Sequence, residues 1–268
     1  MAVGSSTSLT RAIAILNVLG SAEGTTGEGL GVVQIARLVG REKSQVSRTL
    51  RVLAESGLVV RDPESLRYRL GWRLFALAAG VANQHLLTLA PHALRHLVGY
   101  VGERAHLSVL EGNEVLTLLS ERPTRAMKAG GWVGRAAPLY CTSSGRALLF
   151  NHTDSEVRTL LSGADFAAAG PNAPVDIDDL LARLHADRER GWVQSSGEFE
   201  PGMVAVAASV RDFRGRTAAA LNISAPEFRL GHGLVAAGRV VAAAADRLTR
   251  ALTEAGTTTT TTSPRRIS

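Results

Sequence analysis

Residues 32–57 read VVQIARLVGREKSQVSRTLRVLAESG and carry the clearest structural pattern in the first part of the chain. Residues 32–39 have the pattern of a short helix that ends at Gly40, because glycine readily adopts the left-handed conformation that follows a helix. Residues 43–56 predict a second, longer helix, which Gly57 ends in the same way. The stretch therefore predicts two helices joined by a glycine turn.

The longer helix has one apolar and one polar face. Val46, Leu50 and Leu53 recur at helical spacing and should be buried. Hydroxyl, amide and guanidinium groups on the other face can bond base edges in the major groove, and cations can contact phosphates. We assign Ser44, Gln45 and Arg48 to base edges. The polar face as a whole comprises Lys43, Ser44, Gln45, Ser47, Arg48 and Arg51.

A basic hairpin follows this helix. Residues 58–61 and 66–70 are strand-like runs that flank the turn formers DPES. In the second run, Leu66, Tyr68 and Leu70 alternate with arginines, so one face can pack on the helices while the other meets solvent or phosphate. With Lys43 and Arg51, the expected phosphate contacts are Arg61, Arg67 and Arg69.

A further helix precedes residue 32. Leu9, Ile13, Leu16 and Leu19 recur at helical spacing, and Ser8 is placed to cap the start. Three helices and a basic hairpin have the order of a winged helix-turn-helix, whose recognition helix enters the major groove of DNA. A polar helix face can also be merely solvated, but here it is combined with the glycine turn and the basic hairpin. The combination favours nucleic-acid binding.

Composition agrees with a DNA-binding protein and limits the alternatives. The chain has 268 residues, a formal charge of +6 and a pI of about 10.3, which favours a polyanionic partner. Cys141 is the single cysteine, so neither an internal disulfide nor a cysteine zinc site can form within one chain. The start lacks the pattern of a secretory signal, and no apolar run reaches the ~18 residues of a membrane span. We expect a cytoplasmic protein.

The second part of the chain mixes helices and strands. A helix is expected from residue 72 to about 85, and a break before Pro91 separates it from another helix. Later patterns predict strands at 105–110, 114–120, 193–196, 204–210 and 217–223, and helices at 143–150, 177–190 and 234–255. The threonine-rich tail, 257–268, has no apolar periodicity and is expected to be disordered.

Several motifs resemble the IclR family of bacterial regulators. The segment SLTRAIAIL at residues 8–16 is similar to the first helix of that family. The helix-turn-helix residues follow its pattern, as does PLYCTSSGRALL at residues 138–149. The further matching residues are Gly191, Trp192, Gly197, Glu198, Gly202, Asp212 and Gly215. Three positions depart from the family pattern: Glu42 replaces a proline, Tyr140 a histidine and Arg146 a lysine.

The resemblance implies an α+β protein, in which an N-terminal winged helix-turn-helix is joined by a linker helix to a GAF-like α/β effector-binding domain. We expect the DNA-binding domain at 1–71, the linker at 72–90 and the effector-binding and oligomerisation domain at 91–256. The family resemblance also implies homodimers or tetramers that repress or activate transcription. The expected partners are double-stranded operator DNA and a small-molecule effector.

The resemblance also implies a set of effector contacts. These residues are Ser143, Ser144, Ser195, Ser196, Glu198, Met203, Asn222 and Ser224. Ser143 and Ser144 should stand at a helix N-terminus, which favours an anion and suggests an organic or aromatic carboxylic acid. A buried Glu198 carboxylate would repel such a ligand unless it is protonated, points away or pairs with an arginine. Capping and strand-end hydrogen bonds remain the alternative role for these serines.

Two other functions are considered. An architectural DNA-binding protein would bind with little sequence preference and without an effector. An enzyme would need a catalytic constellation, but Cys141 has no histidine near it in sequence and is typical of a small packed hydrophobe. His92 and His96 lie one helical turn apart, yet no third metal ligand is evident. We therefore expect neither catalysis nor a cofactor.

Overall fold

The computed structural model of the protein describes residues 8–21, 24, 28–78, 84–123, 132–167 and 169–260. The chain divides into two compact units, Met1–Gln84 and His85–Ser268. The division falls inside the predicted linker, and each unit has a hydrophobic core of its own. No described helix has the length and hydrophobicity of a membrane span.

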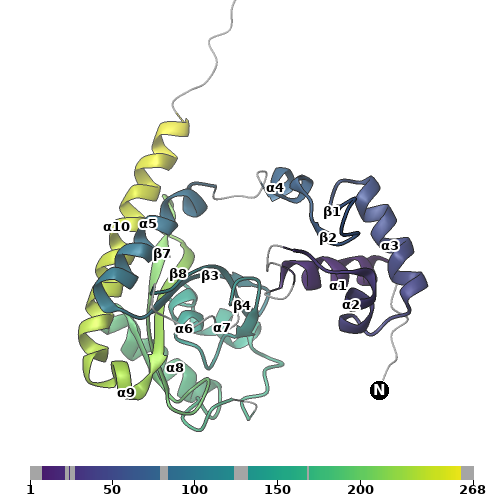
Figure 1. Ribbon diagram of the computed structural model, residues 1–268. Coiled ribbons are helices and arrows are strands. Elements are labelled where there is room, and N and C mark those ends of the chain that lie inside the picture. The colour runs from purple at the N-terminus through teal and green to yellow at the C-terminus, as the bar shows by residue number, and fades with distance from the viewer. Residues whose placement is uncertain are drawn as a thin grey trace, which may run out of the picture. The chain divides into compact units, whose positions relative to one another are not determined.

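The first unit contains the predicted helices and hairpin (Figure 1). Its elements are α1 (Ser8–Gly20), α2 (Val32–Leu38), α3 (Lys43–Glu55), β1 (Val59–Arg61), β2 (Tyr68–Leu70) and α4 (Trp72–Ala78). Strands β1 and β2 pair antiparallel, with Val60 opposite Arg69. The predicted winged helix-turn-helix is thus confirmed. Residues 79–83 of the predicted helix 72–85 lie outside the described residues.

Two glycines end α2 and α3 as expected. Gly40 and Gly57 have φ of 61° and 73°, in the left-handed region. The amide that follows each glycine closes the helix end: Arg41 N donates to Ala36 O at 3.0 Å, and Leu58 N donates to Leu53 O at 2.9 Å. These turns set the direction in which α3 leaves α2 and in which the hairpin leaves α3.

The core of the first unit differs from the prediction in the residues that α1 contributes to it. Residues of α1, α2, α3 and the hairpin meet in it, and they include Ile15, Leu19, Leu30, Ile35, Ala36, Val46, Leu50, Leu53, Val59 and Tyr68. The predicted face of α1 is wrong at Leu9 and Ile13, which are 68% and 50% exposed. The buried stripe instead centres on Ile15 and Leu19.

The predicted inward face of the hairpin is also wrong at two of its three residues. Leu66 and Leu70 are exposed, and only Tyr68 is buried. Leu66 has a φ of 58° and belongs to the turn rather than to a strand, so the expected alternation does not reach it.

The second unit is built on one antiparallel sheet with the strand order β5-β4-β3-β8-β7-β6. The strands are β3 (Arg104–Glu111), β4 (Glu114–Glu121), β5 (Ala136–Pro138), β6 (Val193–Ser196), β7 (Met203–Arg211) and β8 (Thr217–Pro226). The helices are α5 (Gln84–Val101), α6 (Ser143–Leu148), α7 (Asp154–Leu160), α8 (Ile177–Arg190), α9 (Glu227–Leu230), the 3-10 helix η1 (Gly231–Gly233) and α10 (Leu234–Thr260). This arrangement confirms the predicted fold class.

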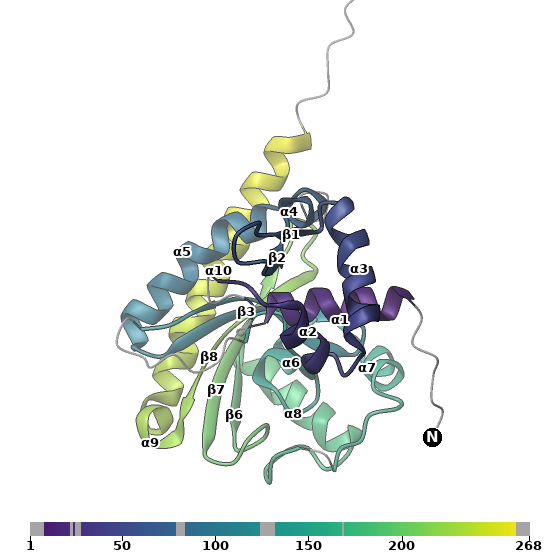
Figure 2. The same cartoon turned by 45° about the vertical axis from the view of Figure 1, so that its right-hand side comes forward.

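Helices cover both faces of the sheet, and each face has its own core. Figures 1 and 2 show α5 and α10 side by side along one face, with α6 and α8 on the other. Alternate residues of β8 divide between the two: Leu221 and Ile223 join the α5 and α10 side, while Ala220 joins the α6 side. Gly238 of α10 lies so close to Trp192 that a Cβ atom there would come within 2.2 Å of the indole ring.

Three details of the second unit correct the predictions. The expected break before Pro91 is wrong, because α5 runs through Pro91 while its apolar stripe, including Leu86, Leu94 and Leu97, packs in the core. Strand β5 and helix α7 were not predicted. The last helix, α10, continues to Thr260, so residues 257–260 of the expected disordered tail are helical, and 261–268 lie outside the described residues.

Candidate functional site

The polar face of α3 carries exposed cations. Lys43, Ser44, Arg48 and Arg51 are exposed, and Gln45 and Ser47 are half-buried. Within the described part of the chain, no carboxylate forms an ion pair with Lys43, Arg48 or Arg51, although such pairs are common elsewhere in the molecule. Since α3 buries Val46, Leu50 and Leu53, its packing holds this cationic face toward solvent.

The hairpin arginines differ from one another. Arg67 is half-buried, and its Nη1 donates to Gly29 O at 3.0 Å, so it ties the hairpin to the segment before α2. Arg69 Nη2 lies 3.7 Å from Asp62 Oδ2 in a loose surface pair, and the Arg61 guanidinium lies 5.6 Å from the centre of the Tyr68 ring. Arg61 and Arg69 are exposed, whereas Arg67 has an internal role.

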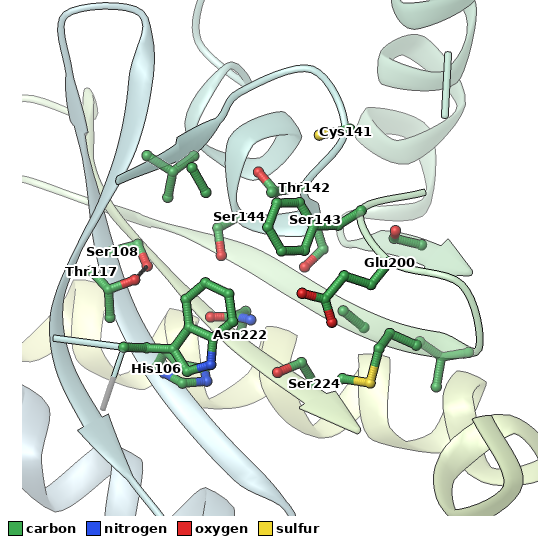
Figure 3. A pocket seen from close by; sticks show the side chains of 18 residues that line it. His106, Ser108, Thr117, Cys141, Thr142, Ser143, Ser144, Glu200, Asn222 and Ser224 are labelled. Carbon is green, nitrogen blue, oxygen red and sulfur yellow. Dashed lines mark hydrogen bonds between the residues drawn. The ribbon is translucent and has the colours of Figure 1, made fainter. Parts of the chain in front are cut away.

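The second unit contains a cavity of about 120 Å³ beside the N-terminal end of α6 (Figure 3). Its volume is similar to that of the ~150 Å³ engineered cavity that admits benzene, so a compact ligand would suit it. The described residues around it are His106, Ser108, Val115, Thr117, Trp132, Ala137, Cys141, Thr142, Ser143, Ser144, Ser195, Phe199, Glu200, Met203, Val204, Ala205, Asn222 and Ser224. Hydroxyl groups and apolar side chains thus line the same space.

The cavity brings together most of the expected effector contacts. These are Ser143, Ser144, Ser195, Met203, Asn222 and Ser224, which come from α6, β6, β7 and β8. Ser196 and Glu198 do not line it. The sequence reasoning missed His106, Ser108, Thr117 and Trp132. A signal was present in β3, where His106 and Ser108 interrupt an apolar run at every second residue and so share one face.

Glu198 is instead part of a buried ion-pair network. Arg146 is 1% exposed. Its Nε donates to Asp187 Oδ2 at 2.7 Å, its Nη1 donates to Glu198 Oε2, and its Nη2 donates to Gln194 O at 2.6 Å. Burial alone would lower the pKa of Arg146, but Glu198 and Asp187 outweigh burial and raise it. Burial raises the pKa of Glu198, while Arg146 and Arg183 oppose this effect. The Glu198 side chain is thus paired with arginines and does not line the cavity.

No described residue lining the cavity is a lysine or an arginine, and Glu200 contributes a carboxylate. Burial, with a smaller contribution from Arg104, lowers the pKa of His106 to about 4, so this side chain is neutral at pH 7. Burial also raises the pKa of Cys141 to about 12, which leaves a thiol rather than a reactive thiolate. The cavity has binding groups but no activated nucleophile among them.

The helix end at the cavity offers less to an anion than the sequence suggested. Helix α6 has only six residues, and Thr142 caps it by accepting the Gly145 N–H at 3.1 Å. Gly145 is required by close packing, since a Cβ atom there would lie 1.9 Å from Leu139 O. His92 and His96 are exposed on α5, and no group of three metal-ligating side chains occurs in the described ranges.

Comparison with known families then identifies the chain. Residues 78–250 match the family model for the bacterial transcriptional regulator IclR C-terminal domain, and residues 8–63 match the IclR helix-turn-helix domain. The chain belongs to the IclR family. The predicted family, and with it the predicted function of a DNA-binding transcription regulator, is confirmed.

Relatives of this IclR chain are regulators as well. It is 29% identical over 201 residues to the HTH-type transcriptional regulator KdgR of Escherichia coli, a match that covers 75% of this chain and 76% of KdgR. It is 27% identical over 223 residues to the HTH-type transcriptional repressor AllR of E. coli, covering 83% and 81%. A solved IclR homologue from Microbacterium hydrocarbonoxydans, complexed with 4-hydroxybenzoate, has a TM-score of 0.71 at 25% identity and covers 91% of this chain and 100% of its own.

Three positions depart from the IclR pattern quoted above, and the structure describes the surroundings of each. Arg146 forms the buried network, in which its planar group donates to three partners at once. Tyr140 donates from its hydroxyl to Asp165 O at 2.7 Å and packs on Phe166. Glu42 stands just before α3 and makes no capping hydrogen bond with its side chain.

Proposed function

We propose that this IclR regulator represses transcription by binding an operator through α3 and the hairpin, and that a small organic acid in the cavity of the second unit changes its operator affinity. The observation that carries the proposal is the exposed face of α3, where Lys43, Arg48 and Arg51 have no ion-pair partner among the described residues. Unpaired cations on a recognition helix provide both phosphate contacts and base readout. The protein would act in the cytoplasm, where its DNA target is.

The proposed DNA contacts divide by chemistry. On the polar face of α3, Ser44 and Arg48 are exposed and Gln45 is half-buried, and these three can bond base edges. Lys43, Arg51, Arg61 and Arg69 are exposed cations suited to phosphates. Arg67 is withdrawn from the expected set of direct contacts, because its guanidinium already bonds Gly29 O. It would position the hairpin instead.

The proposed effector site is the cavity itself, used for binding rather than catalysis. The homologue that holds 4-hydroxybenzoate supports a compact aromatic acid as the ligand class. The high pKa of Cys141 argues against thiolate chemistry there. We further propose domain limits of 1–71, 72–90 and 91–256 and a homodimeric or tetrameric assembly, since a two-fold protein suits an operator with two half-sites.

Footprinting of the full-length protein on the intergenic DNA upstream of its own gene tests the proposal. We expect protection of a near-palindromic site, with half-sites about one or more ~34 Å turns apart, at a protein concentration that leaves random DNA of equal length unprotected at the same salt. Aromatic and short aliphatic acids would then be screened for a change in protection. Equal affinity for both DNAs and no response to any acid would instead indicate an architectural DNA-binding protein.

A further inference from the structure

His106 is a buried polar side chain whose hydrogen bonding is incomplete. It lies on β3 in the wall of the cavity, opposite Asn222 of β8, and is 5% exposed (Figure 3). Its Nδ1 atom is buried and has no hydrogen-bond partner in the part of the chain that the structure describes. Buried polar atoms normally have partners, so an unpaired nitrogen in a cavity wall points to a ligand that supplies one.

The charges around the cavity restrict how an acid could bind. Among the described lining residues, His106 is the one side chain that can become positively charged, and Glu200 is the one carboxylate. Moving an ionised carboxylate out of water into such a site is costly unless a cation accompanies it. Hydroxyl groups such as those of Ser143 and Ser144 can donate hydrogen bonds but cannot neutralise the charge.

We propose that an acidic effector enters the cavity together with one proton, which His106 takes up from solvent so that its imidazolium donates a hydrogen bond to the effector carboxylate. This inference rests on the proposed effector-binding function. The balance is simple: one carboxylate anion, one neutral imidazole and one proton from the buffer form one ion pair, and no bond to carbon changes. His106 thereby selects for acids over their uncharged amides.

The surroundings of His106 make it neutral before the ligand arrives. Its pKa is about 4 because burial disfavours the charged form, and Arg104 on the same strand adds to the effect. The other charged or titratable groups near the described cavity include Glu200 and Cys141 on its wall and Arg135, which lies 5.6 Å from the centre of the Trp132 ring. The paired side chains of Glu198 and Arg146 do not line the cavity but act electrostatically on Cys141. The side chains that line the cavity from β4, β6, β7, β8 and α6 are neutral, among them Thr117, Ser195, Asn222 and Ser224.

A carboxylate beside His106 would favour the protonated form of the imidazole, because an opposite charge within hydrogen-bonding distance raises its pKa. Free acid and free His106 are both deprotonated above about pH 5. Formation of the pair then consumes one proton, and the dissociation constant rises about tenfold for each pH unit while the pair remains protonated. A ligand bound without a proton would show neither effect.

Isothermal titration calorimetry of the full-length protein tests this, with 4-hydroxybenzoate as the probe and 4-hydroxybenzamide as its uncharged counterpart. At about pH 6, titrations in buffers of different ionisation enthalpy should give an uptake of about one proton per benzoate and none per benzamide. Between about pH 5.5 and 6.5 the Kd of the benzoate should rise about tenfold, and that of the amide should not change. Absence of uptake, or absence of binding by the benzoate, overturns the proposal.

Two variants locate the proton. In His106→Gln the uptake should disappear and the benzoate should lose its pH dependence. In Glu200→Gln the uptake should persist, because the proton is not on Glu200, and the benzoate should bind at least as tightly. Uptake that persists in His106→Gln, or disappears in Glu200→Gln, assigns the proton to another group and overturns the proposal. The titrations of the wild-type protein test proton uptake even if neither variant folds.

The outcomes also separate this inference from the proposed function. Release of the operator by uncharged compounds, or by the benzoate without proton uptake, would overturn the role of His106 and leave the effector-gated regulator intact. A protein whose operator footprint responds to no compound at all would overturn both. Each result is read from the same purified protein with the same probes.

Discussion

Arg48 of α3 and Arg146 of α6 carry the same guanidinium group in opposite surroundings. Arg48 is exposed and has no ion-pair partner among the described residues, whereas Arg146 is 1% exposed and donates to Asp187, Glu198 and Gln194. Each of the three guanidinium nitrogens of Arg146 donates to a partner inside the protein, and the side chain is not among the described residues that line the cavity. The donors on the exposed face of α3 remain available to a partner outside the chain. Substitution of Arg48 should therefore weaken DNA binding, whereas substitution of Arg146 should lower the stability of the fold.

The second unit adds a further contrast within its own interior. Arg146 and His106 are both buried basic side chains, but two carboxylates keep Arg146 charged while His106, beside Arg104, is held neutral. Burial disfavours the charged form of both side chains, and it prevails at His106, whereas the two carboxylates outweigh it at Arg146. Because His106 is neutral and Arg146 is already paired, His106 is the side chain that can take up a proton when an anion binds.

The largest expected effect is that of Arg146→Ala on stability. The substitution removes the buried cation that Asp187 and Glu198 share and leaves them only the more exposed Arg190 and Arg183. Breaking a buried ion pair typically costs about 3 to 5 kcal/mol. Urea unfolding followed by tryptophan fluorescence measures it. Arg158→Ala is the matched control, because its pair with Asp178 is exposed and should cost no more than about 1 kcal/mol. Equal losses of stability in the two variants would show that the buried and the exposed arginine do not differ in their contribution to the fold.

The next effect is the acid sensitivity that His106 confers. An unfolded histidine titrates near pH 6.5 and His106 in the fold near 4, so between these values only the unfolded state binds the proton. The stabilisation is present above pH 6.5 and is lost as the pH falls toward 4. Between about pH 7 and 5 the wild type should lose about 2 kcal/mol more than His106→Gln, measured by urea unfolding at each pH. Parallel pH profiles would mean that His106 is not held neutral.

The sequence predicted most elements because their signals are local. Gly40 and Gly57 each end a helix in the conformation expected of them. The polar alternation of β3 was also a local signal that His106 and Ser108 share one face, but it was overlooked. The capping box of Thr153 and Glu156 was an equally local signal for α7, and it was overlooked.

What the sequence could not supply depends on contacts between distant residues. Pro91 should break α5 by local rules, but the packing of Leu86, Leu94 and Leu97 keeps the helix continuous. The pairing of Glu198 with Arg146 joins residues 52 positions apart, so the sequence left open whether Glu198 faces the ligand. The cavity has the same origin, since six strands and α6 contribute to its wall.

Arg48→Ala should behave as the opposite of Arg146→Ala. We expect it to weaken operator binding by about 1 to 3 kcal/mol, because a contact to a base or a desolvated phosphate is lost, and to change stability by no more than about 0.5 kcal/mol. Fluorescence anisotropy with the footprinted operator measures the first and urea unfolding the second. Arg214→Ala removes the same charge from an exposed position in the second unit and serves as the control. Unchanged affinity in Arg48→Ala would remove this residue from the interface.

The smallest expected effects separate two arginines within one hairpin. Arg67→Ala loses a hydrogen bond to Gly29 O and should lower the stability of the first unit by about 1 kcal/mol. Arg69→Ala gives up only a loose pair with Asp62 and should leave stability unchanged, but if Arg69 contacts a phosphate, the slope of log affinity against log salt should fall by about one. Salt titrations and urea unfolding of both variants measure the pair of effects. A smaller salt slope in Arg67→Ala without a loss of stability would show that Arg67 leaves Gly29 O and contacts the DNA. One guanidinium cannot fully maintain its hydrogen bond to Gly29 O and neutralise a phosphate at the same time.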